Sequence, residues 1–592
     1  MNAILAPSAT SAGPDLDPLV DACEVEAYPG EVMERRIAQG GFDPRGKRIQ
    51  VLNPRGTPPP IRLRPMAKRP QDLRGRTVYL VDVRFMNGKS FLEEIQRVFA
   101  ERMPDVKTVL RQKRGGYTED DPELWREIAD NAGLVVMAIG HCSTCAPAVA
   151  VHCMNLEDRG IPTAPLVTTA FVDLVQAVGF KAGMPRLRFT FVPHPVSGRT
   201  GEQLRGLALG ESPGAGLTVI DGLVRALTAP LTAAESKTGD VDRPVPPLLG
   251  ANSEDDLQAM FREAWWSDGL PVVLPTPDRV EAMLKGTKRD PREVIGRMRP
   301  TATQEDWSYT VEQVAVNAVM AGARPEHLPV ILALAASEVT ALHSSTSGFA
   351  SMSVVNGPIR RQIRMNAGLG ALGPFNHANA AIGRSYSLLS RNLGGGAVPG
   401  ITYLGSQGNP LNYNALCFAE NEERSPWEPF HVQKGFGRDA STVSIFRGRT
   451  FSHLLEIRAR TWREQMLNQV ANFTPIPQTG LTLLVEPLAA RALKDREGFA
   501  RKEQLARWYH EHSKLPYDVY WDYQLVINYI EPLARKGQEP FASYLAQPRD
   551  SQVPRFANPD AISTIVVGGE KNAYWFATDF HHVRTVSIDE WR

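Results

Sequence analysis

Short apolar runs and helical segments alternate along residues 77–210, and this pattern constrains the fold more than any other feature of the sequence. The apolar, β-branched runs occupy 77–85, 105–112, 133–140, 163–171 and 187–195. Segments with helical periodicity follow them, at 89–103, 121–132, 145–160, 172–180 and 197–210. Strands and helices that alternate at this spacing form a parallel sheet with helices on both faces. We therefore predict an α/β, doubly wound parallel-sheet domain of the flavodoxin or Rossmann type over residues 73–228.

The rest of the chain predicts an extension, a linker and a second domain. Residues 1–72 predict an N-terminal extension with one strand at 48–52, and residues 229–254, rich in Pro, Ser and charge, predict a linker. Residues 255–592 predict a larger, mixed α/β C-terminal domain. Its expected elements are helices at 254–266, 276–286, 307–322, 325–340, 451–467 and 496–512, loops over the Gly-, Asn-, Ser- and Pro-rich stretch 344–436, and a strand–turn–strand unit at 563–576.

Charge and hydropathy narrow the class of protein. The chain has 66 Lys and Arg against 65 Asp and Glu, a net charge of +1, so no global field draws it to nucleic acid or to an anionic membrane. No run approaches about 18 apolar residues, and the N-terminus has no basic region before an apolar run, so we expect neither a membrane span nor a secretory signal. Five cysteines in 592 residues are typical of a reducing compartment. We expect a cytoplasmic protein that binds neither nucleic acid nor membrane.

A Cys-x-x-Cys motif is the most informative local feature. The run Gly140-His141-Cys142-Ser143-Thr144-Cys145 lies where the third predicted strand ends and a helix begins. Ligands of open α/β sheets bind beyond the carboxyl ends of the strands, and a helix N-terminus favours a thiolate. Cys142 is therefore the expected nucleophile, Cys145 can form a disulfide with it, and His141 can act as acid, base or cation.

A metal site is the alternative interpretation of the same region. His152 and Cys153 follow Cys145 by seven and eight residues on its helix, so these residues could ligate a metal ion together. No second Cys-x-x-Cys or His-x-x-x-His completes a zinc pattern, and Cys153 on an apolar face is typical of a buried thiol. Cys23 and Cys417 have no partner by spacing and are expected to be structural.

The sequence around this motif resembles the UGSC-motif domain, in which many members carry selenocysteine at the first position of U-G-S-C. The resemblance covers about residues 48–210 and includes VVMAIGHCSTCAPAVAVHCMNLEDRGIPTAPLVTTAF and RLRFTFVPHPVSG. Cys142 stands at the selenocysteine position and Cys145 at the motif cysteine, whereas Ser143 and Thr144 replace Gly and Ser. The residues 159–162 (RGIP) and 193–195 (PHP) also match.

The resemblance implies thiolate chemistry at Cys142. The domain is more distantly similar to the selenoprotein B subunit of glycine, sarcosine and betaine reductases, which uses its chalcogen as a nucleophile on an activated small molecule. The C-terminal half resembles a domain of uncharacterised proteins associated with UGSC domains, through 266–284 and 417–432. That second resemblance implies no activity.

Other candidate residues lie at strand ends and in the C-terminal half. His194 follows the fifth predicted strand, so it should emerge at the same sheet edge as Cys142. The interpretation that competes with this is a His held between two prolines for turn geometry. In the C-terminal half, polar residues in Gly-rich surroundings could bind a metal, perform acid/base chemistry or face the thiol site. The competing interpretation is that they form a solvated acidic loop beside an Asn-capped helix. The predicted substrate-binding residues are Asp82, Asn87, Thr168, Thr169, Asn376, His377, Glu420 and Glu422.

Three functions remain open. The first is a thiol-dependent enzyme that reduces or cleaves a carbon–heteroatom bond of a small molecule, with an external thiol as reductant. The second is a non-redox, Cys-dependent lyase or hydrolase, and the third is a metal- or redox-sensing protein. The sequence lacks the GxxxxGK[ST] motif and has no GxGxxG after a predicted strand, so it predicts no nucleotide cofactor. Residues 210–214 (GESPG) match GxSxG, but they follow a predicted helix and not the strand of a nucleophile elbow, so a serine hydrolase is not predicted. A bound metal ion and a homo-oligomer are both compatible with the sequence.

Overall fold

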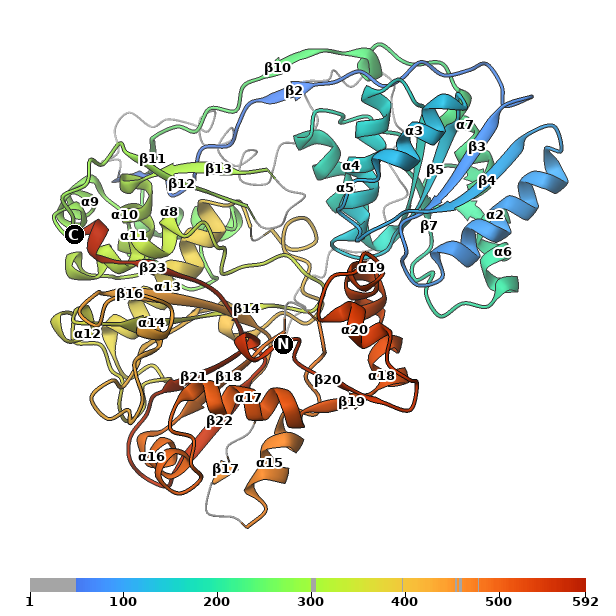
Figure 1. The fold of residues 1–592 in the computed structure, drawn as a ribbon. Helices are drawn as coiled ribbons and strands as arrows, with labels where there is room; N and C mark the ends of the chain where they lie inside the picture. Colours follow the sequence, from blue (N-terminus) through green and yellow to red (C-terminus); the bar gives the residue numbers. More distant parts are fainter. Residues whose placement is uncertain (1–48, 300–304, 397, 453–454, 457–459, 477–478) are drawn as a thin grey trace, which may run out of the picture. The chain divides into compact units, whose positions relative to one another are not determined.

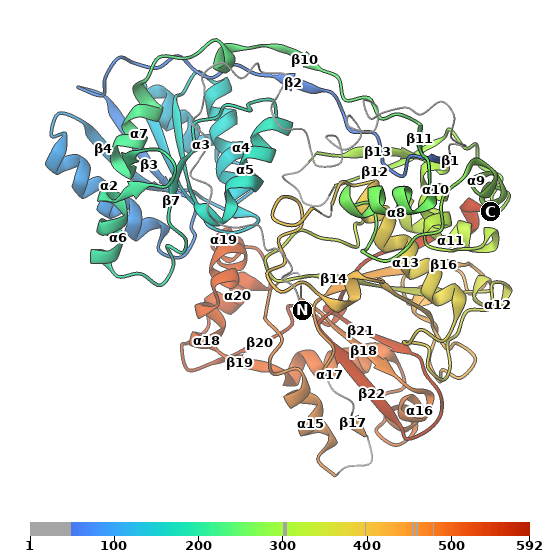
Figure 2. The same ribbon diagram turned by 180° about the vertical axis from the view of Figure 1, so that it is seen from behind.

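The computed structural model describes residues 49–299, 305–396, 398–452, 455–456, 460–476 and 479–592. Its described residues divide into two compact units. Unit 1 contains residues 61–241, and unit 2 contains residues 49–60 and 242–592. The α/β expectation is confirmed in both units, and each is described by itself (Figures 1 and 2). No helix in the described part of the chain is long and apolar enough to span a membrane.

Unit 1 is built on a five-stranded parallel sheet (Figure 1). The strands are β3 (Thr77–Asp82), β4 (Lys107–Gln112), β5 (Leu134–Gly140), β6 (Thr163–Thr168) and β7 (Thr190–Val192). Their spatial order is β4-β3-β5-β6-β7, so the chain leaves β3 first toward β4 and then in the opposite direction from β5 onward. The point at which this order reverses lies between β3 and β5, and it is there that doubly wound sheets bind ligands.

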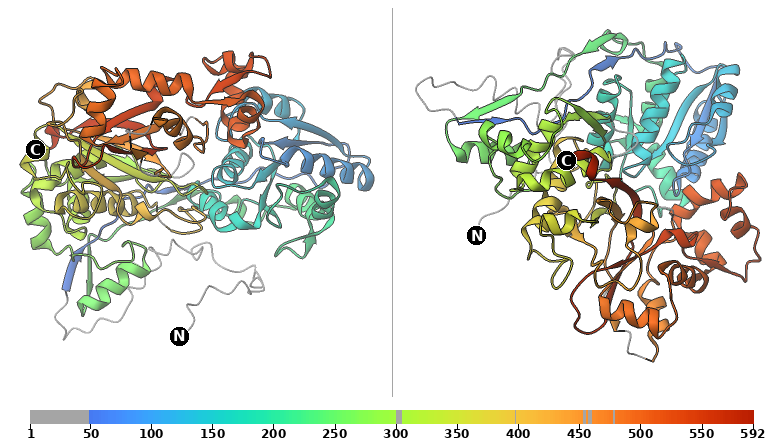
Figure 3. Two further views of the ribbon diagram at one scale, coloured as in Figure 1. Left: turned by 90° about the horizontal axis from the view of Figure 1, so that it is seen from below. Right: turned by 60° about the vertical axis from the view of Figure 1, so that its left-hand side comes forward.

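Helices cover both faces of this sheet, as predicted. The helices α2 (Gly88–Arg102), α6 (Gly201–Leu209) and α7 (Val219–Thr228) share one core with alternate strand residues such as Val78 and Leu80. On the other face, α4 (Cys145–Asp158) contacts α5 (Val172–Lys181), and α3 (Pro122–Asp130) contacts α4 through a Trp125–His152 ring pair. Two further views show the same strands and helices (Figure 3). A short hairpin, β8 (Glu211–Ser212) and β9 (Leu217–Thr218), precedes α7.

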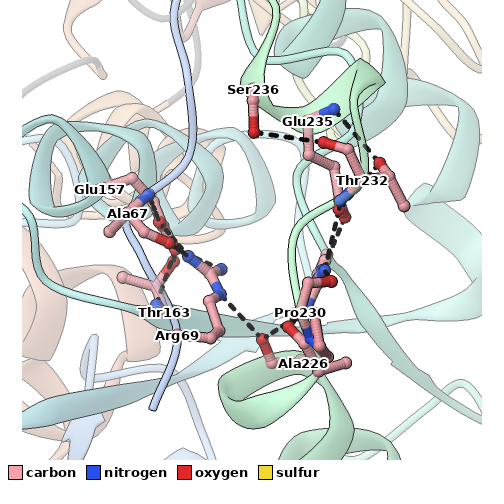
Figure 4. Close-up of polar contacts among 11 residues, drawn as sticks. Ala67, Arg69, Glu157, Thr163, Ala226, Pro230, Thr232, Glu235 and Ser236 are labelled. Carbon is pink, nitrogen blue, oxygen red and sulfur yellow. Dashed lines mark hydrogen bonds and ion pairs between the residues drawn. The ribbon is translucent and has the colours of Figure 1, made fainter. Parts of the chain in front are cut away.

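Unit 1 extends beyond the predicted domain at both ends. The sequence assigns 61–72 to an extension and 229–241 to a linker, but β2 (Ile61–Leu63) pairs with β10 (Gly239–Val241). The guanidinium of Arg69 forms an ion pair with Glu157 of α4 at 2.6 Å, and both side chains are fully buried (Figure 4). On the other segment, Glu235 forms an ion pair with Arg188, which precedes β7, at 2.6 Å. Because these contacts join segments distant in sequence, composition alone does not mark them as part of the domain.

The remainder of the predicted linker belongs to unit 2. There β11 (Leu248–Ala251) pairs with β1 (Ile49–Leu52), the strand expected near 48–52. Unit 2 carries two four-stranded mixed sheets. The first has the order β15-β14-β16-β23 and the second β17-β22-β18-β21. The strands are β14 (Ala350–Asn356), β15 (Leu416–Ala419), β16 (Thr442–Gly448), β17 (Leu455–Glu456), β18 (Leu481–Val485), β21 (Ile562–Val566), β22 (Tyr574–Thr578) and β23 (His581–Ser587).

Most helices expected in unit 2 are present. They are α8 (Glu254–Glu263), α9 (Pro277–Leu284), α10 (Val311–Met320), α11 (Leu328–Ala336), α15 (Trp462–Gln469) and α17 (Lys502–His512). The other described elements include β12 (Val294–Met298), α12 (Ile359–Gln362), α14 (Phe430–Gln433), α16 (Pro487–Asp495), β19 (Lys514–Pro516), α18 (Tyr517–Asp522), the π-helical turn Val526–Ile530, α19 (Glu531–Arg535), α20 (Phe541–Leu545) and β20 (Gln552–Pro554).

Four predictions for unit 2 need correction or refinement. The helix expected over 451–467 starts at Trp462, because Leu455–Glu456 form β17, which pairs with β22. The helix expected from residue 307 starts at Val311, because β13 (Trp307–Thr310) pairs with β12 before it. The stretch 344–436 contains the expected loops, but it also contains β14 and the 16-residue helix α13 (His377–Asn392). The two strands near 563–576 exist, but β18 lies between them, so they do not form a hairpin.

Candidate active site

The Cys-x-x-Cys motif lies at the carboxyl edge of the unit 1 sheet, beside the point where the strand order reverses. The strand β5 ends at Gly140, and α4 begins at Cys145, so Cys142 occupies the turn between them. A Cβ on Gly140 would lie 2.8 Å from Val167 Cγ2 and 3.0 Å from Ala146 Cα. Gly140 therefore allows α4 to start close against the sheet, and this sets the position of the turn.

The two cysteines have different environments. Cys142 is partly exposed and Cys145 is fully buried. The backbone N–H of Cys145 donates to Cys142 Sγ at 3.0 Å, and the N–H of His141 donates to Cys145 Sγ at 3.2 Å. Burial raises the pKa of Cys142, but hydrogen bonds from the Cys145 side chain and from the N–H groups of Cys145 and Thr144 outweigh it and lower that pKa. Burial and the hydrogen bond to Cys142 raise the pKa of Cys145 well above the ordinary value.

His141 is a neutral, buried side chain in this arrangement. Its ring stacks on Phe85 with centroids 4.7 Å apart and meets the His194 ring edge-on at 4.4 Å. Burial, with a smaller contribution from His194, lowers the pKa of His141 to about 4. Of the three roles expected for His141, the cation is therefore wrong near neutral pH, whereas a neutral imidazole keeps its capacity to accept or donate a proton.

His194 lies at the same sheet edge, in the loop that follows β7. Its Nδ1 is 3.0 Å from Thr168 Oγ1, and its backbone N–H donates to Thr169 Oγ1 at 3.3 Å. Thr168 Oγ1 is also 3.3 Å from the carbonyl oxygen of Gly140. The ring of His194 remains exposed, although partial burial lowers its pKa. Thr168 and Thr169 thus orient His194 and link its loop to the end of β5.

Asp82 ends β3 and is almost completely buried. Burial raises its pKa to about 6, although Gln112 Nε2 and the N–H of Arg84 each donate to its carboxylate at 2.9 Å. A Cβ on Gly88 would lie 2.6 Å from Asp82 Oδ1, so the first residue of α2 leaves room for this carboxylate. Asp82 is thus an acid whose protonation changes near pH 6, at the carboxyl edge of the sheet.

Asn87 joins two of the loops at this edge. Its Oδ1 accepts from the N–H of Gly198 at 2.8 Å, and its Nδ2 donates to the carbonyl of Arg199 at 3.3 Å. Asn87 itself has φ 62°, a left-handed conformation that asparagine tolerates better than most residues. The loop after β3 is thereby fixed to the loop that carries His194.

The metal interpretation is not supported by a cluster of ligands among the described residues. The described residues include no group of three or more His, Cys, Asp or Glu side chains placed to hold a metal ion. His152 Nε2 lies 2.8 Å from the carbonyl oxygen of Tyr117, and Cys153 is a fully buried free thiol whose pKa is raised by burial. Cys417 is also a buried free thiol, whereas Cys23 lies outside the described residues.

The candidates of unit 2 have structural partners. Asn376 is the N-cap of α13: its Oδ1 accepts from the N–H of Asn379 at 3.0 Å, and its Nδ2 donates to the carbonyl of Arg364 at 2.9 Å. This agrees with the interpretation of an Asn-capped helix. His377 is exposed, and its Nε2 lies 3.0 Å from the carbonyl oxygen of Gly322.

Glu420 is not at a surface that could face a substrate, which corrects the prediction. Its side chain is fully buried, with Lys502 Nζ 2.7 Å from Oε1 and Asn356 Nδ2 2.7 Å from Oε2. Glu422 pairs with Arg360 at 2.8 Å and accepts from the N–H of Gly357 at 2.8 Å. Both carboxylates neutralise buried cations, so their contacts account for them without a ligand, and they do not form a solvated loop either.

Two residues of the site are absent from the sequence prediction. Phe85 stacks on His141, and Gln112 holds the Asp82 carboxylate. Gln112 is the residue directly opposite Asp82 in the β3–β4 register, a pairing that follows from the strand order and register of the structure. Phe85 follows β3 in an irregular loop, to which no strand register applies.

Comparison with known proteins gives one match. Residues 50–213, which include the Cys-x-x-Cys turn and the strand ends around it, match the model of the UGSC family. No curated protein and no solved structure matches the chain.

Proposed function

We propose that this chain, a UGSC-domain protein by its match over residues 50–213, is a thiol-dependent enzyme that reduces or cleaves a carbon–heteroatom bond of a small molecule. Cys142 is the proposed nucleophile and Cys145 the resolving thiol. The observation that carries the proposal is the unequal environment of the two sulfurs. One is partly exposed and accepts hydrogen bonds that favour its thiolate, and the other is buried as a thiol directly beside it.

In the proposed first step, the Cys142 thiolate attacks the electrophilic carbon of a substrate R–X. The new S–C bond forms as the C–X bond breaks, and X leaves with its electron pair and takes up a proton. His194 is our candidate to carry that proton, because its ring is exposed and Thr168 holds its Nδ1. As a neutral imidazole it takes the proton of the Cys142 thiol when the thiolate forms, and it then passes this proton to X.

In the second step, Cys145 loses its proton and attacks the sulfur of Cys142. The S–S bond forms as the S–C bond breaks, and the carbon leaves with the electron pair and is protonated to R–H. The substrate is thereby reduced by two electrons and the two thiols are oxidised to a disulfide. An external dithiol then reduces that disulfide by exchange, which restores the enzyme.

A second candidate function is a non-redox Cys-dependent lyase or hydrolase. The imidazoles of His141 and His194 favour this second function. Both are neutral, their ring centroids lie 4.4 Å apart, and a neutral imidazole can take a proton from the water that attacks a Cys142 adduct. The two candidates differ in their need for Cys145. In the redox enzyme Cys145→Ser stops after the adduct, whereas in the hydrolytic enzyme the same variant keeps turning over.

Hydrogen peroxide is the probe for redox competence of the pair. Attack of the Cys142 thiolate on peroxide gives a sulfenic acid and water, and Cys145 then forms the disulfide with loss of a second water. We expect peptide mapping of the reduced, full-length protein to show one Cys142–Cys145 disulfide that dithiothreitol reverses and that Cys142→Ser abolishes. Oxidation that stops at a sulfenic acid on Cys142, or zinc, iron or copper that co-purifies in stoichiometric amount and is lost in Cys142→Ser, would argue against the redox enzyme.

A further inference from the structure

A row of polar side chains crosses three strands of the first sheet in unit 2. Ser351 of β14 lies directly opposite Arg447 of β16, and Arg447 lies directly opposite His581 of β23. Side chains of directly opposed residues in antiparallel pairs point to the same face. Ile445, two residues before Arg447 on that face, belongs to the core formed with α10, α11 and α13. The row therefore lies beneath this helical layer rather than in the core between the two sheets.

The residues above the row add polar groups, and the acid whose charge acts on His581 is Asp579, which is paired with Arg449. Tyr386 of α13 is fully buried, and its hydroxyl donates to the carbonyl of Val339 at 2.7 Å. His343 is close enough to Arg447 and His581 for their charges to act on it, and burial lowers its pKa to about 3. Burial likewise lowers the pKa of His581 to about 4. Both histidines are neutral near pH 7, so the charge of the cluster is that of Arg447.

The guanidinium of Arg447 lacks a counter-charge in the described part of the chain. Its one hydrogen bond there is a long contact of 3.5 Å from Nη2 to the carbonyl of Thr340, and no ion pair includes it. Its Nε is enclosed without an acceptor, and Nδ1 of His581 and Oγ of Ser353 are enclosed without a partner too. By contrast, Arg449, two residues along, pairs with Asp579 at 3.0 Å.

A cation in this position is costly. Removal of a charged group from water is compensated in folded proteins by an opposite charge or by full hydrogen bonding, and Arg447 has neither. A water molecule could accept from Nε, but it brings no charge to balance the guanidinium. Arg447 and His581 are each only partly buried as residues, so the row has contact with solvent.

We propose that Arg447, with His343 and His581, binds an oxyanion, either a carboxylate or a phosphoryl group of a small ligand. The guanidinium supplies the charge and a planar set of donors that matches two oxygens, and the N–H groups of the neutral imidazoles supply further donors. This site belongs to unit 2 and uses no residue of the thiol site.

Thermal unfolding of the full-length protein tests the proposal, with sodium phosphate, sodium acetate and sodium chloride compared at equal ionic strength. We expect phosphate or acetate to raise the midpoint temperature of unfolding relative to chloride. An anion that binds only the folded protein, at 100 times its Kd, multiplies the folding equilibrium constant about 100-fold. A rise with phosphate alone identifies a phosphoryl ligand, and a rise with acetate alone identifies a carboxylate. In Arg447→Met the rise should vanish, whereas Arg491→Met, at a half-exposed arginine paired with Glu570, should keep it.

The same variant separates a ligand site from a structural arginine. In chloride, Arg447→Met should unfold at the same midpoint as the wild type or above it, since it removes an unpaired charge and keeps most of the side-chain volume. A lower midpoint, or failure to fold, would show that Arg447 serves the fold and would overturn the proposal. The proposal would also be overturned if neither phosphate nor acetate raised the midpoint temperature of the wild type, or if the rise were equal in the wild type and in Arg447→Met.

Discussion

The backbone N–H of Cys145, the first residue of α4, lies 3.0 Å from Sγ of Cys142 and donates a hydrogen bond to it. The N–H groups of a first helical turn have no acceptor within the helix, so a sulfur placed there receives a hydrogen bond without loss of one elsewhere. A negative sulfur is also favoured by the helix dipole. This contact is among those that lower the pKa of Cys142 and so favour its thiolate.

Cys145→Ala should slow the reaction of Cys142 with iodoacetamide at neutral pH. The variant keeps the backbone donor but removes the side-chain hydrogen bond, which is among the interactions that lower the pKa of Cys142. Cys145→Ser, which retains a donor of similar size, should react at close to the wild-type rate. Peptide mass spectrometry of quenched samples measures both rates, and equal rates for the Ala and Ser variants would contradict the expected role of the Cys145 side chain.

Asp82→Asn should remove a pH dependence of stability. Burial raises the pKa of Asp82 to about 6, above the usual value of about 3.9 for an Asp side chain, so the folded state binds this proton more tightly than the unfolded state does. The wild type therefore loses stability as the pH rises from about 4 to about 6, by about 3 kcal/mol at most.

Urea unfolding between pH 4 and 7 checks this prediction. The free energy of unfolding of Asp82→Asn should rise relative to that of the wild type as the pH rises through that window. Above the window the difference between the two proteins should stay constant. Gln112 can turn its amide to accept from the new Asn, so the variant keeps a partner. Asp72→Asn, at an exposed residue, is the matched control and should show no such gain. A constant difference between wild type and Asp82→Asn from pH 4 to 7 would contradict the raised pKa.

His141 should show no titration between about pH 5.5 and 8 in NMR spectra. Burial and the neighbouring His194 lower its pKa to about 4, so it stays neutral in the folded state while the unfolded state takes up a proton below about pH 6.5. Its contribution to stability is thus present above that pH and is lost as the pH falls toward 4. His194→Gln removes the smaller cause and should raise the pKa of His141 without restoring its ordinary value. Titration of His141 near pH 6.5 in the wild type would contradict its burial.

Glu157→Gln should destabilise unit 1 strongly. The Glu157 carboxylate accepts from Arg69 at 2.6 Å and from the N–H groups of Ala67 and Thr163 at 2.7 Å each. Loss of its charge leaves the buried Arg69 unbalanced, at a cost of about 3–5 kcal/mol. The exposed pair of Arg74 with Asp72 is the control, since solvent screens it and its loss should cost far less stability. Equal small losses for Glu157→Gln and Asp72→Asn in urea titrations would contradict the structural role of the buried pair.

The sheet of unit 1 could be predicted because its strands are continuous apolar runs, such as Leu134–Gly140, in which every residue is buried. The two ends of unit 1 in the sequence could not be predicted. The strand β2 has three residues, and the segment after it is held by Arg69, 88 residues before its partner Glu157 in the sequence. No local pattern reports such a contact.

The length of α13 could not be predicted for a related reason, although its Asn cap could. The helix contains Gly, Ser and Asn, which are typical of loops, but a Cβ on Gly383 would lie 2.0 Å from the carbonyl oxygen of Ala415. Small residues here permit close packing rather than a turn. In the thiol site, the position of Cys142 and His194 at strand ends follows from the pattern, whereas the stacking of Phe85 on His141 depends on how an irregular loop folds back.

The rate of alkylation of Cys142 as a function of pH tests the central claim most directly. The reduced, full-length protein is treated with iodoacetamide between pH 5 and 10, and peptide mass spectrometry follows Cys142 and Cys23 in the same samples. The account predicts that Cys142 reacts faster than Cys23 at neutral pH and titrates with an apparent pKa below about 8.5, the value of a free thiol. A Cys142 that titrates at or above that value, or that reacts no faster than Cys23, would contradict the assignment of Cys142 as the nucleophile.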